Sequence, residues 1–336
     1  MSDLVLDSIN SFPDQSLSAW QESSVLKFPD SYRQISNILV CGMGGSRFTP
    51  LTIKHLFSQE IKLPYEIIDD YFLPNYAHEH SLVVLSSYSG TTEEVISCAN
   101  QAKARNCRIV QVSTKPIIDV PGYIFDPTQF NPSQQPRLGN GYLLFAHLGL
   151  LYSLNLIDLN PKQILNSIQF ARKISLTRTL TTQAKNLAKQ LKDSYPFIVC
   201  AEFLKGFANG FANQLNENSK MISDFHYLSE LNHHLLEGLS RPETLQQNGL
   251  FIFFNSYFYS PQIRKRLFLT QEVVSKQKIK TIIISLAGPD KLSQVLEAFL
   301  ISGLTTYYLA KIYGVDPINI PWVNFFKSKL SSLVKS

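Results

Sequence analysis

Residues 82–112, LVVLSSYSGTTEEVISCANQAKARNCRIVQV, contain an apolar run, a polar loop, a helix-length segment and a second apolar run. The first run, Leu82 to Leu85, and the last, RIVQV, are rich in Val, Leu and Ile, which is typical of buried strands in a parallel sheet. The segment between them, EEVISCANQAKARN, is long enough for a helix. This order predicts two parallel strands with a helix between them.

The same alternation continues on both sides of this stretch. NILVC and YEIID precede it, and FIVCAE, LFIFFN and TIIISL follow a helical region near residues 160–193. A chain of 336 residues is long enough for two domains of ordinary size. We therefore expect an α/β fold with two domains, each a parallel sheet flanked by helices. The expected boundaries are 1–155 for the N-terminal domain, 156–190 for connecting helices, and 191–336 for a C-terminal domain with a terminal helix.

The polar loop of the opening stretch is unusually rich in hydroxyl groups, at Ser86, Ser87, Ser89, Thr91 and Thr92. In a parallel sheet, ligands lie at the carboxyl ends of the strands, where loops lead into helix N-termini. A single Ser or Thr is enough to cap a helix, so capping does not explain five hydroxyls. Free amides, the positive end of a helix dipole and hydroxyl donors together suit a phosphate group. We therefore favour a phosphate-ester site over helix capping.

A glycine-rich segment, CGMGGSRFTP, follows the first predicted strand. In a dinucleotide-binding G-x-G-x-x-G pattern that begins at Gly42, the third glycine would be Arg47, where close packing of helix on strand requires a small residue. This departure disfavours a nucleotide-binding oxidoreductase. Gly44 and Gly45 instead offer bare amides beside the Ser46 hydroxyl, which suits a sugar hydroxyl or a developing oxygen charge.

Composition excludes several other classes of function. The net charge of +5 is spread along the chain, with one short basic run at residues 264–266, so we expect a small anionic ligand and no nucleic-acid partner. The H-x-H pattern of His78 and His80 has no identifiable third ligand, so we expect no metal and no cofactor. The apolar segment GYLLFAHLGLLYSLNLI contains polar residues and is shorter than a bilayer span, which favours a buried helix and no membrane partner.

The cysteines and the N-terminus indicate the cellular compartment. The four cysteines have no CxxC spacing, which predicts buried thiols in a reducing environment rather than a zinc site or disulfides. The N-terminal segment MSDLVLDSINSFPDQS carries acidic residues where a signal peptide carries basic ones. We therefore expect a cytoplasmic protein.

Five segments in chain order carry a resemblance to a known family: CGMGGS, SSYSGTTEE, QPRLGNGYLLF, NENSKMISDFHYLSELNHHLLEG and YGVDPINIPWVNFFKSKL. Together they resemble the bifunctional phosphoglucose/phosphomannose isomerase family, which is built from two sugar-isomerase (SIS) domains. The resemblance spans almost the whole chain. It implies a hexose 6-phosphate substrate and, together with apolar helices such as 141–157, a homodimer.

The resemblance also implies roles for individual residues. The phosphate would be held by hydroxyls of the SSYSGTTEE segment, and the sugar would lie close to the glycine-rich segment. The residues implied for binding are Ser87, Ser89, Thr92, Gly45 and Ser46, and those implied for catalysis are Arg137, Glu217, His233 and Lys327.

These residue types fit the chemistry of an aldose–ketose isomerase. Moving a carbonyl between C1 and C2 requires a carboxylate near both carbons, and Glu217, flanked by Asn216 and Asn218, is the candidate. Arg137 would stabilise the enediolate charge, and His233 and Lys327 would serve ring opening. Taken alone, each residue has an ordinary structural interpretation as a surface, salt-bridged or core group.

Three points stay open in the sequence. Arg47 stands where the family usually has a small residue, and DPINI replaces a commoner DPTPV, so the preference between glucose and mannose epimers is unsettled. The doublet His233 and His234 leaves a choice of ring-opening histidine. The alternative function is a noncatalytic SIS sensor that binds a phosphosugar and needs only the phosphate loop.

Overall fold

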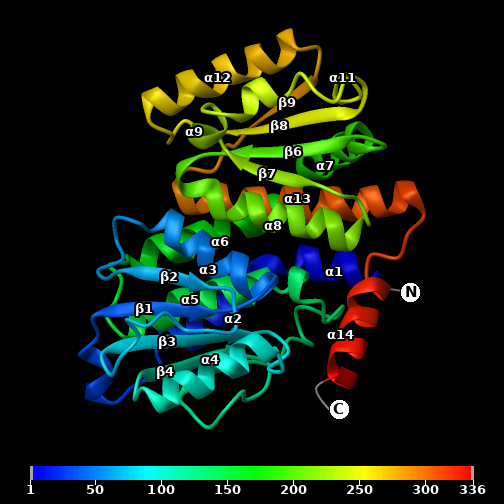
Figure 1. The fold of residues 1–336 in the computed structure, drawn as a ribbon. Coiled ribbons are helices and arrows are strands. Elements are labelled where there is room, and N and C mark those ends of the chain that lie inside the picture. Colours follow the sequence, from blue (N-terminus) through cyan, green and yellow to red (C-terminus); the bar gives the residue numbers. More distant parts are fainter. Residues whose placement is uncertain (1–2, 334–336) are drawn as a thin grey trace.

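The computed structural model describes residues 3–333 and has two parallel sheets, one in each half of the chain (Figure 1). The N-terminal sheet has the strand order β2-β1-β3-β4-β5, and its bounds are β1 Asn37–Cys41, β2 Tyr65–Ile68, β3 Ser81–Ser87, β4 Arg108–Ser113 and β5 Gly122–Ile124. The C-terminal sheet has the order β7-β6-β8-β9, with β6 Tyr195–Cys200, β7 Asp224–Tyr227, β8 Gly249–Asn255 and β9 Lys280–Ser285. Every pair of neighbouring strands is parallel, so the predicted α/β class is confirmed.

Helices cover both faces of the N-terminal sheet. One face packs against α4 (Glu93–Ala104), which is the crossover helix predicted between β3 and β4. The other face packs against α3 (Gly45–Leu56) and α5 (Asn140–Ser153), and α2 (Phe12–Ser23) lies on α5. Twelve of the fourteen residues of α5 are buried, so the prediction of a buried helix in this apolar segment is confirmed.

The C-terminal sheet is also covered on both faces. α12 (Pro261–Lys276) lies on the outer face, and α8 (Lys205–Asn218) lies on the face toward the N-terminal half. α8 packs beside α13 (Lys291–Tyr313), which also contacts α6 (Pro161–Ser175) and α7 (Arg178–Leu191). α13 has the length and composition of a membrane span, but 83% of that apolar window is buried inside the protein, as expected for a core helix.

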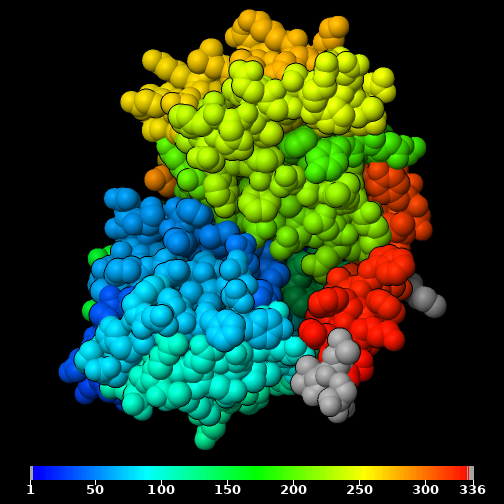
Figure 2. Space-filling model, in the orientation of Figure 1, coloured from blue at the N-terminus to red at the C-terminus, as the bar shows by residue number. Residues whose placement is uncertain are grey.

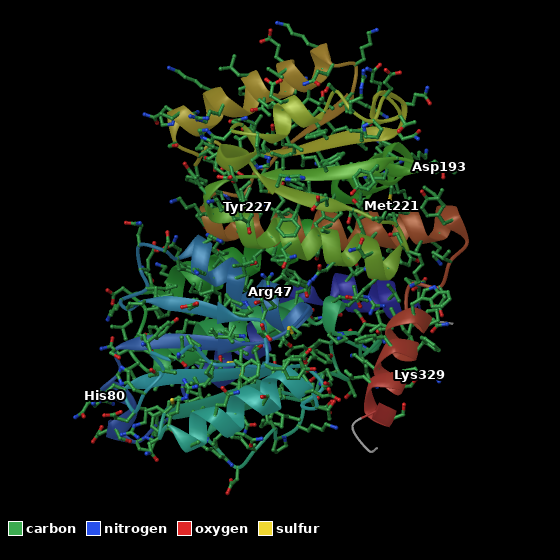
Figure 3. The ribbon with its side chains drawn as sticks, in the orientation of Figure 1. Arg47, His80, Asp193, Met221, Tyr227 and Lys329 are labelled. Atoms are coloured by element: carbon green, nitrogen blue, oxygen red, sulfur yellow. The ribbon has the colours of Figure 1, made fainter. Side chains whose placement is uncertain are left out.

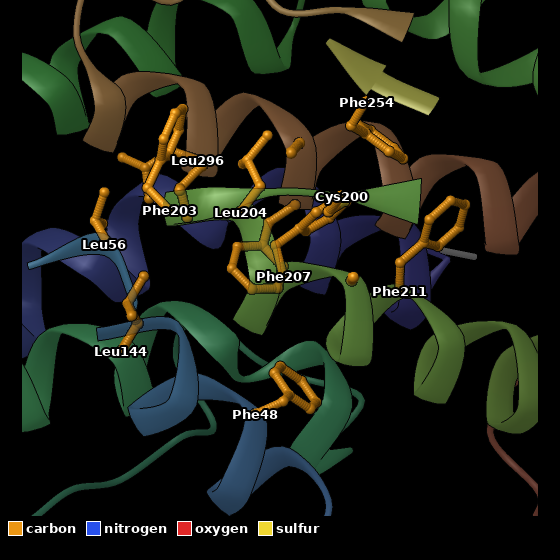
Figure 4. Packing of buried hydrophobic residues seen from close by; sticks show 14 of the residues in the cluster. Phe48, Leu56, Leu144, Cys200, Phe203, Leu204, Phe207, Phe211, Phe254 and Leu296 are labelled. Atoms are coloured by element: carbon orange, nitrogen blue, oxygen red, sulfur yellow. The ribbon is translucent and has the colours of Figure 1, made fainter. Parts of the chain in front are cut away.

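The two sheets share one hydrophobic core. A single cluster of buried side chains runs from the N-terminal helices through the helical layer to the C-terminal sheet. Figure 4 shows its centre, where Phe48 of α3 and Leu144 of α5 lie below Phe207 and Phe211 of α8. Because α3 packs directly against α8, the two halves are held in a fixed relation.

The remaining elements are short or peripheral. α1 (Leu4–Asn10) packs against α13, and α14 (Pro321–Leu333) extends from the body beside the N-terminal half (Figure 1). Trp322 of α14 is 81% exposed, so this helix buries little of its apolar surface. The other elements are the helices α9 Leu228–Leu231, α10 Leu235–Gly238 and α11 Leu245–Asn248, and the 3-10 turns η1 Asp30–Arg33, η2 Pro136–Leu138 and η3 Glu202–Leu204.

Candidate active site

The hydroxyl-rich loop follows β3 and leads into α4, as the sequence predicts. Ser87 ends β3, and its buried hydroxyl accepts a hydrogen bond from the amide of Gly90 at 3.1 Å. Gly90 has a φ of +68°, and a Cβ there would lie 2.8 Å from Cγ of Lys115, so the turn requires glycine. The Thr92 hydroxyl lies 2.8 Å from that of Ser87. The turn therefore gathers these hydroxyls at the carboxyl end of the sheet.

The hydroxyls of this loop are not used as helix caps. Thr92 is the N-cap residue of α4, yet in the described part of the chain its side chain makes no capping hydrogen bond. The amides of Glu93, Glu94 and Val95, in the first turn of α4, also have no backbone partner among residues 3–333. Ser89 is exposed beside this helix end. These free amides and the Ser89 hydroxyl form an anion cradle, which favours phosphate binding over simple capping.

The glycine-rich segment lies directly against this loop. Gly44 has a φ of +52°, and α3 begins at Gly45. The Ser46 hydroxyl accepts a hydrogen bond from the amide of Tyr88 at 2.9 Å, which joins the two loops. A Cβ on Gly45 would lie 3.1 Å from the carbonyl oxygen of Pro136, so the segment carrying Arg137 packs against this glycine. Ser46 is only 4% exposed, and its hydroxyl therefore orders the loops from beneath.

A cavity of about 690 Å³ opens beside the phosphate loop. Its lining includes Ser89 and Pro136, together with Thr114 at the end of β4 and Asp126 and Gln134 in the segment before η2. The volume is in the range of pockets that bind small molecules. The cavity thus has room for a sugar beside Ser89, but Arg137 and Glu217 are not among its lining residues.

Arg137 is the most completely buried charge of the site, with an exposure of 1%. Its Nε donates to Oδ1 of Asn218 at 2.6 Å, and Nη1 donates to Oε1 of Gln135 and to Oε2 of Glu217, both at 2.9 Å. Its Nη2 donates to the carbonyl oxygens of Pro317 and Ile318, at 2.6 and 3.1 Å. All five N–H groups therefore have partners within the chain.

Burial shapes the electrostatics of this arginine. Desolvation lowers the pKa of Arg137 from its ordinary value, and the neighbouring Glu217 opposes that shift. The guanidinium stays charged, because an arginine pKa starts above 12. With every donor in use, Arg137 can act on a ligand through its charge and through the groups that it orients.

Glu217 is the solvent-accessible partner of Arg137. It lies in the last turn of α8, and its side chain is 30% exposed, whereas that of Arg137 is 1% exposed. The ion pair therefore has one buried and one accessible member. A carboxylate held on one side and open on the other can exchange a proton with a ligand.

A chain of contacts connects Glu217 with the phosphate loop. The Tyr88 hydroxyl accepts a hydrogen bond from Nδ2 of Asn131 at 2.7 Å, and Asn131 also donates to the carbonyl oxygen of Gln135. Gln135 in turn accepts from Arg137, which holds Glu217. The structure thus joins Ser46, Ser87, Arg137 and Glu217 into one region at the carboxyl edge of the N-terminal sheet.

His233 does not lie in this region within one chain. α8 runs back from the carboxyl end of β6, so Glu217 lies near the amino end of β7. α9 begins directly after the carboxyl end of β7, and His233 follows α9 on the exposed surface. Figure 3 shows Met221 and Tyr227 at opposite ends of this strand. The neighbouring His234 is exposed as well, with its Nε2 3.8 Å from Oε1 of Glu230.

Lys327 lies on α14, on the other side of the region. Its side chain is exposed. The segment that leads into α14 is held by Arg137 through the carbonyls of Pro317 and Ile318, so the position of α14 depends on the site. Figure 2 shows the surface hollowed between α14, in red, and the body of the protein. Lys327 is therefore carried by a helix that borders this hollow.

Known proteins with sequences similar to both halves of this chain are sugar-phosphate isomerases by name. Residues 180–330 match the family described as the bacterial phospho-glucose isomerase C-terminal SIS domain. The bifunctional phosphoglucose/phosphomannose isomerase of Caldicellulosiruptor bescii is 26% identical, and the match covers 98% of this chain and 99% of that protein. The enzyme of the same name from Thermoplasma acidophilum is also 26% identical, over 91% of this chain and 94% of its own length. Over nearly its whole length the chain is thus similar to bifunctional phosphoglucose/phosphomannose isomerases.

A solved structure shows the same fold as this chain. The C-terminal domain of glucosamine-fructose-6-phosphate aminotransferase from Francisella tularensis superposes with a TM-score of 0.71. The two sequences are 16% identical, and the match covers 94% of this chain and 98% of that one. The two-SIS-domain architecture predicted from the sequence is thereby confirmed.

The structure accounts for two positions at which this chain departs from the motifs of the family that it resembles. Arg47 points away from the phosphate loop, since its Nε donates to Asp69 at 2.6 Å and its Nη1 donates to Asn209 of α8 at 2.8 Å. It therefore bridges the two halves of the protein (Figure 3). The DPINI segment contributes backbone carbonyls to Arg137, which any residue provides, so the side chain of Ile318 is not required for that contact.

Sequence reasoning missed several members of the site. Gln135 and Pro317 contact Arg137, but neither a side-chain amide nor a backbone carbonyl has a sequence signature. Asn218 was recognised as polar surroundings, but its place at Nε of Arg137 could not be foreseen. Lys220 was also missed, and its ammonium donates to the carbonyl oxygen of Glu217 at 2.5 Å. Its neighbourhood in NENSK was the available signal.

Proposed function

We propose that this protein is an aldose–ketose isomerase that interconverts glucose 6-phosphate, and also mannose 6-phosphate, with fructose 6-phosphate. The observation that carries the proposal is the Glu217–Arg137 pair, a solvent-accessible carboxylate held at 2.9 Å by a buried guanidinium. A phosphosugar sensor needs a phosphate cradle but has no use for a positioned base. The names of the relatives and the resemblance of the motifs support the same reaction.

In this proposal the phosphate lies on the free amides of α4 and on Ser89 and Thr92, and the sugar extends toward Glu217. The Glu217 carboxylate takes the proton from C2 of the open-chain aldose, and a proton from a general acid reaches O1 as the enediol forms. Glu217 then returns its proton to C1 while O2 loses its own proton and becomes the carbonyl. The charge of Arg137 favours the enediolate oxygens in a water-poor site.

The same intermediate accounts for two epimeric substrates. Glucose 6-phosphate and mannose 6-phosphate differ only in the configuration at C2, and C2 becomes planar when the proton leaves. The configuration is therefore lost in the enediolate. A single base serves both epimers if the pocket accepts the sugar with either face of C2 toward Glu217.

We also propose that the active form is a homodimer in which His233 acts on the site of the second copy. The support is topological, because one chain holds Glu217 and His233 at opposite ends of β7. Light scattering tests the dimer. If sites are shared, a mixture of inactive Glu217→Gln and His233→Ala subunits that exchange partners regains about a quarter of wild-type activity. A monomer with full activity contradicts the proposal.

Ring opening is assigned in the same proposal to His233 and Lys327. Hexose phosphates exist mainly as rings, and opening requires a proton to move between O5 and O1. A histidine can carry that proton near neutral pH, and Lys327 can orient the ring oxygen. The place of Lys327 on α14, beside the hollow, supports that role.

For the cellular role, we propose a cytoplasmic enzyme of glycolysis and gluconeogenesis. The four buried free thiols support a reducing compartment such as the cytoplasm.

The direct test is a coupled assay on purified protein with glucose 6-phosphate and mannose 6-phosphate supplied separately, in the presence of a chelator. Formation of fructose 6-phosphate from either epimer establishes the isomerase class, and formation from both establishes the dual substrate range. Binding of the phosphosugars without any turnover would contradict the proposal and favour the sensor.

A further inference from the structure

Lys220 places a second positive charge at the end of α8 that carries Glu217. Its Nζ donates to the backbone carbonyl oxygen of Glu217 at 2.5 Å. That carbonyl belongs to the last turn of the helix, where carbonyl groups lack intrahelical partners and the dipole is negative. A carboxylate such as that of Glu217 is disfavoured there, and a cation is favoured. Lys220 therefore compensates for an unfavourable placement of the proposed base.

The backbone of Lys220 is bent back to make this contact possible. Lys220 has a φ of +56°, in the left-handed region that favours glycine, and the amide of Met221 closes the turn on the carbonyl of Leu215 at 3.2 Å. The chain uses glycine in the same conformation after α13, at Gly314. A lysine in this conformation is less favourable than a glycine, but its side chain can reach back to the last turn of α8.

The other charges around Lys220 belong to the same site. Desolvation lowers the pKa of Lys220, although the residue as a whole is exposed; the charge of Arg137 lowers it further, whereas Asp316 and Glu217 oppose the shift. Lys220 thus lies within electrostatic range of both members of the ion pair and of Asp316, in the segment that leads to α14. It joins the end of α8 to the group of charges around Arg137.

Building on the proposed isomerase function, we propose that Lys220 is a positioning residue for Glu217. Its ammonium fixes the last turn of α8, which carries Glu217, through the hydrogen bond to the Glu217 carbonyl oxygen. Arg137 holds the side chain of Glu217 from the buried side, and Lys220 holds its backbone. Neither role requires Lys220 to touch the substrate.

The chain offers a matched control for this idea. Lys278 follows α12 with a φ of +63°, and its side chain is exposed, with no hydrogen bond or ion pair found within residues 3–333. Replacing either lysine by glycine relieves a left-handed backbone in the same way. Only the replacement of Lys220 also removes a charge and a donor from the Glu217 turn. Lys278→Gly therefore controls for the general effect of glycine in a left-handed turn, and Lys220→Arg, which keeps the backbone restriction and the charge, separates the side chain from the backbone at position 220.

The experiment compares kcat, KM and thermal stability for Lys220→Gly, Lys220→Asn, Lys220→Arg and Lys278→Gly. For Lys220→Gly and Lys220→Asn we expect kcat/KM to fall about tenfold with little change in KM. Lys220→Arg should retain most of the activity, and Lys278→Gly all of it.

Stability separates a positioning role from a merely structural one. Glycine and asparagine tolerate the left-handed conformation, which offsets the lost hydrogen bond, so these variants should unfold close to the wild-type temperature. Wild-type kcat in a folded Lys220→Gly protein would overturn the inference while leaving the isomerase proposal intact. A wild-type protein that shows no isomerase activity would instead refute the proposed function, and the role of Lys220 would fall with it.

Discussion

Replacing Arg137 by methionine should destabilise the protein far more than removing an ordinary surface arginine. Arg137 is 1% exposed, and its five N–H groups bind side chains or carbonyls of three separate segments: residues 135–137, the end of α8, and residues 317–318 before α14. Methionine has a similar length but no donors. The substitution therefore leaves Glu217 and Asn218 without their shared partner and releases the segment that leads to α14.

The expected size of this effect follows from the contacts. Five hydrogen bonds to a charged group, at roughly 1.5–3 kcal/mol each, would sum to about 7–15 kcal/mol. That sum is an upper bound for two reasons. The variant no longer pays the desolvation free energy of the buried guanidinium, and water can hydrate the Glu217 carboxylate, whose side chain is 30% exposed. Breaking a buried ion pair by removing one partner typically costs about 3–5 kcal/mol, which is the loss that we expect.

Thermal and urea denaturation measure this loss, and Arg172→Met is the matched control. Arg172 pairs with Asp14 between α6 and α2, but its side chain is 47% exposed, so its removal should cost about 1 kcal/mol or less. Arg137→Met should lower the melting temperature by about 5–10 °C. If Arg137→Met is no less stable than Arg172→Met, the buried network does not hold the site together and the reasoning is refuted.

Two further predictions concern binding and pH. Replacing Ser89 and Thr92 together by alanine should raise the KM for hexose 6-phosphates without loss of stability. The expected loss of binding free energy is about 1.5–3 kcal/mol for each lost hydrogen bond to phosphate. Unchanged affinity would exclude the proposed cradle. His147 is fully buried in α5, and desolvation lowers its pKa to about 4, so the unfolded chain binds a proton more readily than the folded protein below about pH 6.5. Its contribution should therefore reduce the free energy of unfolding by about 2 kcal/mol between pH 7 and pH 5, and His147→Leu should flatten that dependence in urea denaturation; an equally steep dependence in the variant would refute the assignment.

The fold could be predicted from the sequence wherever apolar runs alternate with helix-length segments. NILVC, LVVLS and RIVQV became β1, β3 and β4, because strands buried on both faces need continuous apolar residues. The short strands β5 and β7 were not predicted, since GYI and DFHY carry no such run. β7 pairs with β6 along one side only, at the edge of its sheet, so its sequence is under weaker apolar constraint.

The site could be predicted only in part. The hydroxyl loop was recognisable because its composition exceeds what a helix cap needs, and Arg137 and Glu217 were implied by family motifs. Their ion pair joins residues 80 positions apart, which no local pattern encodes. The separation of His233 from Glu217 could not be foreseen either, because it depends on the direction in which α8 runs back across the sheet.

The central claim is that Glu217 carries the proton between C1 and C2. Proton exchange at C1 of fructose 6-phosphate in deuterated solvent follows that step without requiring complete turnover. Glu217→Gln preserves the shape of the side chain and can still accept a hydrogen bond from Arg137, but it has no basic oxygen. We expect this variant to fold, to bind phosphosugar, and to exchange the C1 proton about 10²- to 10⁴-fold more slowly than the wild type. Exchange at the wild-type rate would show that another residue is the base and would contradict the account.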